Sequence, residues 1–89
     1  MTLDPNKLAL ESISSDLKRI SMGLYLKSYT LVDRFAKEAL ARKSEVQVAS
    51  LPLYIRKLLS ELDSAVQDAD QALMISTILQ NFCIHNYSK

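Results

Sequence analysis

Cys83 and His85 form a Cys-x-His pair near the carboxyl end of the chain, and they are its only cysteine and its only histidine. Thiolate and imidazole both bind zinc, but a structural zinc site needs four ligands and the sequence offers no second pair. A nucleophilic cysteine would need a lowered thiol pKa and a base held beside it, and no orienting partner is recognisable. We expect Cys83 to be a small buried hydrophobic residue, with no metal and no cofactor.

Other catalytic patterns are equally weak. Glu61 and Asp63 are two positions apart, so on a helix they point to different sides. One glycine cannot build a phosphate-binding loop, and no Ser/His/Asp set is recognisable. We therefore predict that the protein is not an enzyme.

Four basic residues, Arg42, Lys43, Arg56 and Lys57, lie on either side of a predicted loop. A phosphate backbone or an acidic partner could dock there, because each neutralised phosphate releases a counterion. The net charge of +1 supplies no wider attractive field, and only Tyr54 could stack on a base. Basic residues at the end of a helix are also explained by the helix dipole. Nucleic-acid binding is the second interpretation.

Tyrosine suits the rim of an interface, because its ring is apolar and its hydroxyl stays hydrated. Tyr25 and Tyr29 lie four apart on one helical face, where they could mark a surface that another protein covers or simply edge the core. The apolar residues that crowd the last helix between Ile75 and Phe82 are expected to be among the most buried or the most adhesive of the molecule. With the tyrosines, they make up the predicted protein interface: Tyr25, Tyr29, Tyr54, Ile75, Ile78, Leu79 and Phe82.

The composition predicts an all-α protein with a single helical domain over residues 1–89. Hydrophobic residues make up 48% of the sequence, whereas glycine occurs once and proline twice, so sheet and loop breakers are scarce. No apolar run approaches the ~20 residues that span a bilayer, and no basic stretch precedes an apolar core at the amino terminus. We expect a soluble, cytoplasmic (intracellular) protein without a membrane partner.

The first helical region is predicted over residues 5–43. Asp4 can cap it and Pro5 suits its first position. Apolar residues then recur at threes and fours through Leu10, Ile13, Leu17, Ile20, Leu24, Leu31, Phe35 and Ala39. Gly23 leaves two alternatives, namely a tolerated glycine in one continuous helix, or a bend at residues 21–23 that folds residues 5–20 back as a separate helix.

A loop is predicted over 44–51, and a second helical region over 52–85, with Ser50 as a candidate cap before Pro52. Its stripe runs through Ile55, Leu59, Leu62, Val66, Ala69 and Leu73. Past Leu73 the phase changes and the apolar residues cover more of the helix. Either the helix continues beside a second neighbour, or a break near 68–74 opens a further helix.

Two continuous helices would each reach roughly 50 Å, and a lone hairpin of that length leaves apolar surface exposed. The predicted fold is therefore a long antiparallel helical hairpin or a small three- or four-helix bundle, completed by self-association.

Part of the chain resembles the helical domain of GINS replication-complex subunits, on the runs Leu17-Lys18-Arg19-Ile20, Tyr25-Leu26-Lys27-Ser28-Tyr29 and Leu51-Pro52. The β-rich domain of that family has no counterpart here. The resemblance implies association with a replication complex as one example of an assembly role. It assigns no role to any individual residue.

These observations predict a non-catalytic protein-protein assembly module, either a homodimer or a small subunit of a larger complex. A small nucleic-acid-associated accessory protein is the alternative, with the basic loop end as its contact. A third interpretation is a helical bundle that binds an apolar ligand near residues 75–82.

Overall fold

The computed structural model describes residues 4–87, and within them the chain is helical, which confirms the all-α prediction. The helices are α1 (Pro5–Tyr25), α2 (Tyr29–Lys43), α3 (Leu53–Ser60), α4 (Leu62–Ala65) and α5 (Ala69–Tyr87), with a 3-10 turn at Val48–Ser50. Among the described helices, none combines the length and the apolar character needed to cross a membrane.

The start of α1 is as predicted. The Asp4 carboxylate accepts a hydrogen bond from the Asn6 N–H at 2.8 Å, and Pro5 is the first helical residue.

The predicted continuous helix over 5–43 is wrong, because the chain turns between Tyr25 and Tyr29. Lys27 adopts a left-handed conformation with φ of 58°. Around it, the Ser28 N–H donates to the Gly23 carbonyl at 2.8 Å and the Lys27 N–H donates to the Leu24 carbonyl at 3.3 Å. This pair of bonds is the Schellman ending of a helix, in which a glycine usually occupies the position of Lys27.

Gly23 does not bend the chain. The alternative of a bend at 21–23 is confirmed in that the first segment packs back as a separate helix, and it is wrong in the position of the turn, which lies at 26–28. Gly23 lies inside α1, where a Cβ would come within 2.8 Å of the Val32 Cγ2 on α2. The glycine therefore allows α1 and α2 to approach each other closely just before the turn.

Residues 44–51 connect α2 to α3, and the side chain of Asn6 holds this connection from α1. Its Nδ2 donates to the Gln47 carbonyl at 3.1 Å and to the Ser50 Oγ at 2.8 Å, while its Oδ1 accepts from the Gln47 N–H at 2.8 Å. Ser50 is occupied in this network and does not cap α3, which begins after Pro52 without a side-chain cap. The buried Asn6 amide thus pairs with both backbone groups of Gln47 and ties the connection to α1.

The predicted continuous helix over 52–85 is divided into three. The first break, at Glu61, was not predicted. The second lies at 66–68, at the near edge of the break predicted near 68–74. There Asp68 caps α5, because its Oδ1 accepts from the N–H groups of Asp70 and Gln71 at 3.0 and 3.1 Å.

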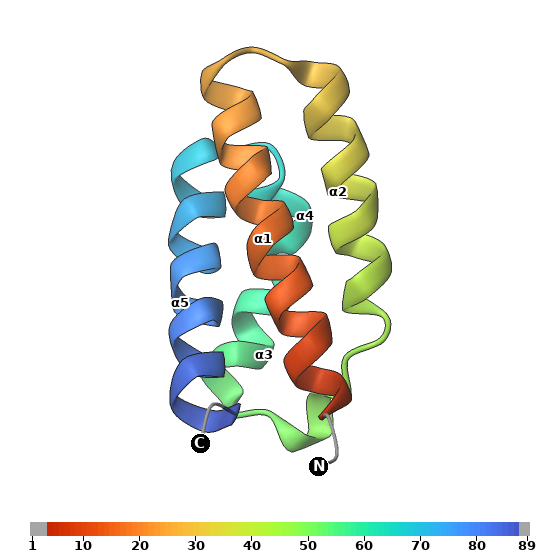
Figure 1. Cartoon of the computed structure of the whole chain (residues 1–89), viewed down its shortest axis with the longest axis vertical. Helices are drawn as coiled ribbons and strands as arrows, with labels where there is room; N and C mark the ends of the chain where they lie inside the picture. Colours follow the sequence, from red (N-terminus) through yellow and green to blue (C-terminus); the bar gives the residue numbers. More distant parts are fainter. Residues whose placement is uncertain (1–3, 88–89) are drawn as a thin grey trace.

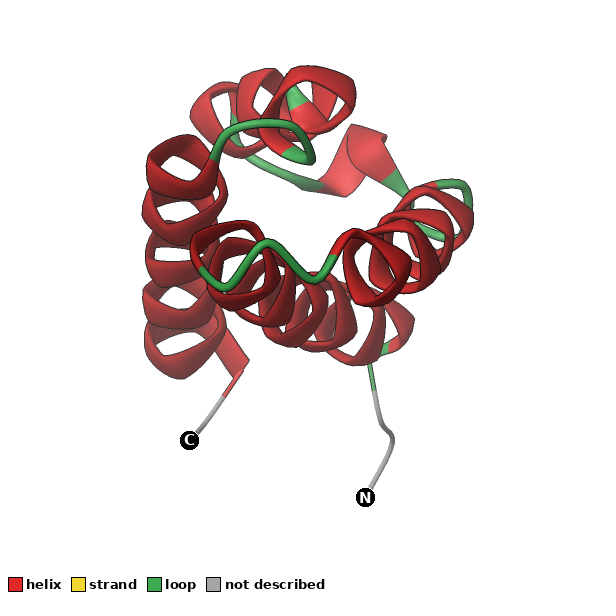
Figure 2. Cartoon of the chain, turned by 90° about the horizontal axis from the view of Figure 1, so that it is seen from above, coloured by secondary structure: helices red, strands yellow, loops and turns green. Residues whose placement is uncertain are grey.

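The helices form two layers (Figures 1 and 2). Helices α5, α1 and α2 lie side by side with α1 in the middle, in contact with both, and α3 and α4 lie behind them in Figure 1. The largest fully buried side chains fill the space between the layers: Leu10, Ile13, Leu17, Ile20, Ile55, Leu59, Leu62, Ile75 and Leu79.

Candidate functional site

The α5–α1–α2 layer is covered on one side only. Helices α3 and α4 lie against its inner side, and within residues 4–87 nothing lies in front of α1 in Figure 1. We call this uncovered side the open face. Its midline is the outer side of α1, the α1 crest, which consists of Leu8, Glu11, Ser12, Ser15, Lys18, Arg19 and Met22.

The crest includes two large apolar side chains in solvent. Leu8 is 51% exposed and Met22 is 58% exposed, although both belong to the helix that supplies the centre of the core. A single exposed apolar residue needs no explanation, but two on one helical face, with a groove on each side, form a candidate contact surface.

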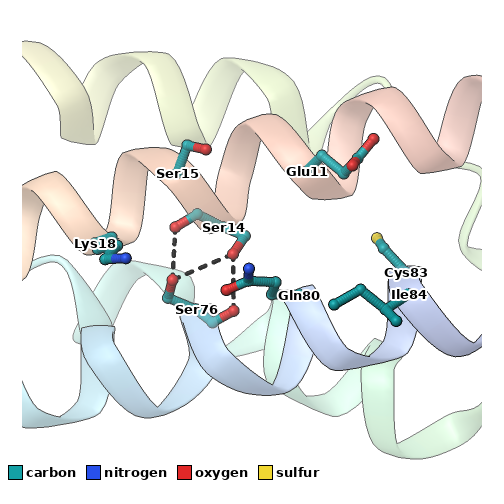
Figure 3. Close-up of a pocket in the computed structure, with 8 residues that line it drawn as sticks. All are labelled: Glu11, Ser14, Ser15, Lys18, Ser76, Gln80, Cys83 and Ile84. Atoms are coloured by element: carbon teal, nitrogen blue, oxygen red, sulfur yellow. Dashed lines mark hydrogen bonds between the residues drawn. The ribbon is translucent and has the colours of Figure 1, made fainter.

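The first groove lies between α1 and α5, and it contains a hollow of about 210 Å³ (Figure 3). At its base, the Ser14 Oγ donates to the Ser76 carbonyl and the Ser76 Oγ donates to the Ser14 carbonyl, both at 2.7 Å. Each buried hydroxyl therefore has a hydrogen-bond acceptor on the other helix, and the reciprocal pair fixes the register of α1 against α5. Glu11 and Lys18 line the rim of this groove.

Cys83 also lies along this groove, and its side chain is buried. Burial raises the pKa of its thiol to about 11, with a further contribution from the charge of Glu11. The thiol is therefore protonated at neutral pH, whereas nucleophilic attack and metal binding need the thiolate. Within the described residues, no three groups of the metal-binding types lie together.

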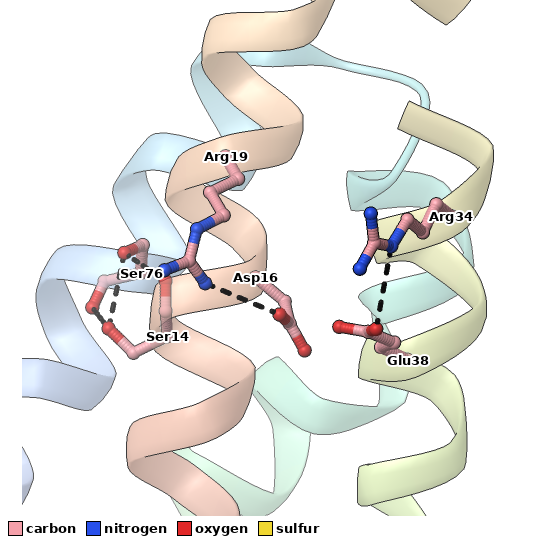
Figure 4. Close-up of polar contacts among 6 residues, drawn as sticks. All are labelled: Ser14, Asp16, Arg19, Arg34, Glu38 and Ser76. Atoms are coloured by element: carbon pink, nitrogen blue, oxygen red, sulfur yellow. Dashed lines mark hydrogen bonds and ion pairs between the residues drawn. The ribbon is translucent and has the colours of Figure 1, made fainter. Parts of the chain in front are cut away.

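The second groove lies between α1 and α2, where the carboxyl groups of Asp16 and Glu38 face each other (Figure 4). Asp16 approaches Arg19 at 3.8 Å, and Arg34 approaches Glu38 at 3.9 Å. Burial raises the pKa of Asp16, the negative charge of Glu38 raises it further, and Arg19 and Arg42 oppose this. The groove is polar and nearly balanced in charge, so it strongly attracts neither sign.

The open face ends in an apolar hollow beside the α1–α2 turn. Met22, Tyr25 and Leu26 of α1 and its turn line it together with Leu73 of α5. The Tyr25 hydroxyl donates a hydrogen bond to Asp70, and this bond raises the pKa of the phenol. Tyr25 thus joins α1 to the start of α5 while its ring stays exposed.

The seven predicted interface residues do not form one surface. Ile75, Leu79 and Phe82 are buried in the core of their own chain, and Ile78 packs against that core. Of the two alternatives for this stretch, burial is therefore the one observed, and these side chains do not form an exposed adhesive surface in the single chain. Tyr25 and Tyr29 are exposed at one end of the molecule. Tyr54 lies on α3, with its ring at 6.3 Å from that of Phe82 in an edge-to-face contact.

The four basic residues around the loop are not joined by a common contact. Arg42 lies 3.5 Å from Glu45 and borders the groove between α1 and α2. Lys43 is half-buried at the end of α2, and Arg56 and Lys57 are exposed on α3.

The α1 crest was missed by sequence reasoning. Its residues recur in threes and fours as regularly as the core stripe, and this spacing was the available signal. The crest mixes Leu8 and Met22 with charges and serines, however, so the apolar pattern that marks the core does not detect it.

Comparison of the chain with known protein families, with curated proteins and with solved structures finds no significant match. The resemblance to the helical domain of GINS subunits gains no support from these comparisons.

Proposed function

We propose that this protein is a non-catalytic assembly module that binds a second copy of itself through the open face. The observation that carries the proposal is the one-sided covering of the α5–α1–α2 layer, which leaves Leu8 and Met22 exposed beside two grooves. A row of three helices has two sides, and each side is buried only where other elements pack against it. In this chain, elements pack against one side only.

The size of the face supports a second copy as the occupant. The molecule measures 40 × 25 × 21 Å, and the open face spans the two longer dimensions. A standard specific interface buries roughly 800 Å² on each partner. A face of this size supplies that area, and the crest carries Glu11 and Lys18, opposite charges that a second copy can pair.

The other two interpretations have less support. A nucleic-acid contact at the loop end would need its basic side chains free, whereas Arg42 faces Glu45. An apolar ligand near residues 75–82 would need space, whereas Ile75 and Leu79 fill the core.

Sedimentation velocity over a concentration series, from low to high micromolar, tests the proposal. The expected result is a species of twice the 10.0 kDa mass of the chain at the upper concentrations. A protein that stays monomeric throughout the series overturns it.

A matched pair of variants places the contact. Met22→Glu introduces a charge on the open face and is expected to weaken the dimer at least about tenfold, because the carboxylate would be desolvated. Leu53→Glu is the control, since Leu53 is even more exposed, at 73%, but lies on α3. If both variants weaken the dimer equally, the open face is not the contact.

A further inference from the structure

We infer that the second copy packs antiparallel along the α1 crest, with Glu11 of each chain paired with Lys18 of the other and Ser15 at the crossing point. This inference rests on the proposed self-association and names the contact within it.

The two exposed apolar residues of the crest lie at equal distances from Ser15. Leu8 lies seven positions before Ser15 and Met22 lies seven positions after it, so both are two helical turns away on the same side. Glu11 and Lys18 lie between them, on the side of the crest that borders α5, where both line the same groove.

A symmetric dimer uses the same patch on both copies, so each residue must suit the one that the two-fold axis brings opposite. An axis across α1 beside Ser15 runs the two helices in opposite directions. It brings Leu8 opposite Met22 of the second copy. On the α5 side of the crest, it brings Glu11, four positions before Ser15, within one residue of Lys18, three positions after it. Each dimer then has two apolar contacts and two pairs of opposite charge, whereas a parallel arrangement would bring like residues together.

The middle of the crest is small. Ser15 lies at the crossing point, with Ser12 and Lys18 three positions away on either side, and packed helix axes lie 8–10 Å apart according to the side chains between them. Serines at this point allow the closer end of that range, which brings the flanking charges and apolar side chains of the two copies into reach.

The two charges are available for this contact. Within the described residues, Lys18 takes part in no ion pair, and Glu11 has only Lys7 of its own helix, at a long 4.0 Å. Both charges remain hydrated in the single chain, so a partner charge gains attraction at little desolvation cost.

Charge reversal tests the pairing. Glu11→Lys and Lys18→Glu each replace two attractive pairs by two repulsive ones, and each is expected to raise the dimer dissociation constant at least about tenfold. The double variant E11K/K18E restores both pairs and should bind within about threefold of the original protein. Lys57→Glu and Asp63→Lys, on α3 and α4, are matched reversals away from the open face and should change nothing.

Mixing the two single variants gives the sharpest result. Within one variant every pair is repulsive, but E11K facing K18E restores opposite charges at both positions, so a mixed dimer should form although neither variant dimerises alone. A folding defect cannot produce this rescue. A dimer that is unaffected by the reversals, or variants that do not rescue each other, overturns the inference while leaving self-association in place.

Cross-linking tests the crossing point. In a Cys83→Ser background, Ser15→Cys should form an intermolecular disulfide on oxidation, because residues on a two-fold axis meet their own copies within the 4.4–6.8 Å that the bond requires between Cα atoms. Ser60→Cys, exposed on α3, is the control. Equal cross-linking of the two variants contradicts the inferred axis, and a monomer in sedimentation contradicts the proposed function as well.

Discussion

The two sides of α1 differ in what they bury, although both follow the same helical spacing. The inner side carries Leu10, Ile13, Leu17 and Ile20, which are fully buried between the layers. The crest carries Leu8 and Met22 among serines and charges, and both stay half-exposed. The inner side supplies the core of the single chain, and the outer side is left for a partner. The following predictions test this difference.

The largest effect is expected from Leu17→Ala. Leu17 is fully buried, so its truncation removes core packing and should lower the free energy of unfolding by about 2–5 kcal/mol. Leu8→Ala on the crest should change it by no more than about 0.5 kcal/mol when the chain is monomeric. Urea denaturation at low protein concentration measures both. Equal losses would show that the two sides of α1 contribute alike to folding.

Gly23→Ala tests the close approach of α1 to α2 at the edge of the core. The added methyl would meet the Val32 Cγ2 at 2.8 Å, and a β-branched side chain yields little. Overpacking of about 1–3 kcal/mol outweighs the roughly 1 kcal/mol that alanine gains in helix propensity, so a net loss of about 1 kcal/mol is expected.

Removing the clashing group is the control for that prediction. In a Val32→Ala background the methyl has room, so Gly23→Ala should there be neutral or stabilising. If Gly23→Ala is equally harmful in both backgrounds, the contact with Val32 is not the reason for the glycine.

Lys27→Gly should stabilise the protein, by roughly 0.5–1 kcal/mol. Lys27 has a φ of 58°, which strains a residue with a Cβ but not glycine, and this gain exceeds the extra entropy of the unfolded chain. Thermal unfolding measures the change. Lys37→Gly, inside α2, is the control and should destabilise. A lower midpoint for Lys27→Gly would contradict the left-handed turn.

Asp16→Asn should give a smaller effect, and one that depends on pH. Burial and Glu38 raise the pKa of Asp16 above its ordinary 3.8, so the folded chain binds this proton more tightly than the unfolded chain does. Stability from the protonated form is therefore lost as the pH rises through the folded pKa. Asparagine stays neutral, so the free energy of unfolding of the variant should rise relative to that of the original protein as the pH increases above about 4.

Urea denaturation at several pH values checks this sign. Asp33→Asn, which removes an exposed carboxylate from α2, gives the background. The free energy of unfolding of Asp16→Asn is compared with that of the original protein at each pH. If the advantage of the variant stays constant or shrinks as the pH rises, the raised pKa of Asp16 is contradicted.

Several local features could be predicted from the sequence. Asp4 and Pro5 start α1 because their effects act within one turn of backbone, and the apolar spacing of residues 10–20 places that side of the helix in the core. The break before Ala69 was anticipated from the change of apolar phase. The break at Glu61 was not, because the stripe through Leu59 and Leu62 runs across it without interruption.

The candidate site was less predictable. The tyrosines were singled out by residue type, but Tyr25 is the last residue of α1 and Tyr54 lies in the first turn of α3, and these two helix ends lie at opposite ends of the molecule in Figure 1. Ile75, Leu79 and Phe82 were expected to need a second neighbour, and the neighbours belong to the same chain. Conversely, the crest combines residues that look like an ordinary solvated surface until α3 and α4 are seen to cover only the opposite side.

The sequence by itself determined the helical class, the start of α1 and the inner stripe, because capping and helical periodicity are local and repeat along the chain. Only the tertiary structure decided where α1 ends, that its outer face is left uncovered, and which apolar residues remain exposed. Those outcomes depend on contacts between distant residues, such as Gly23 with Val32 and Asn6 with Gln47, and on which helices pack behind α1. The open face is therefore a property of the packed chain.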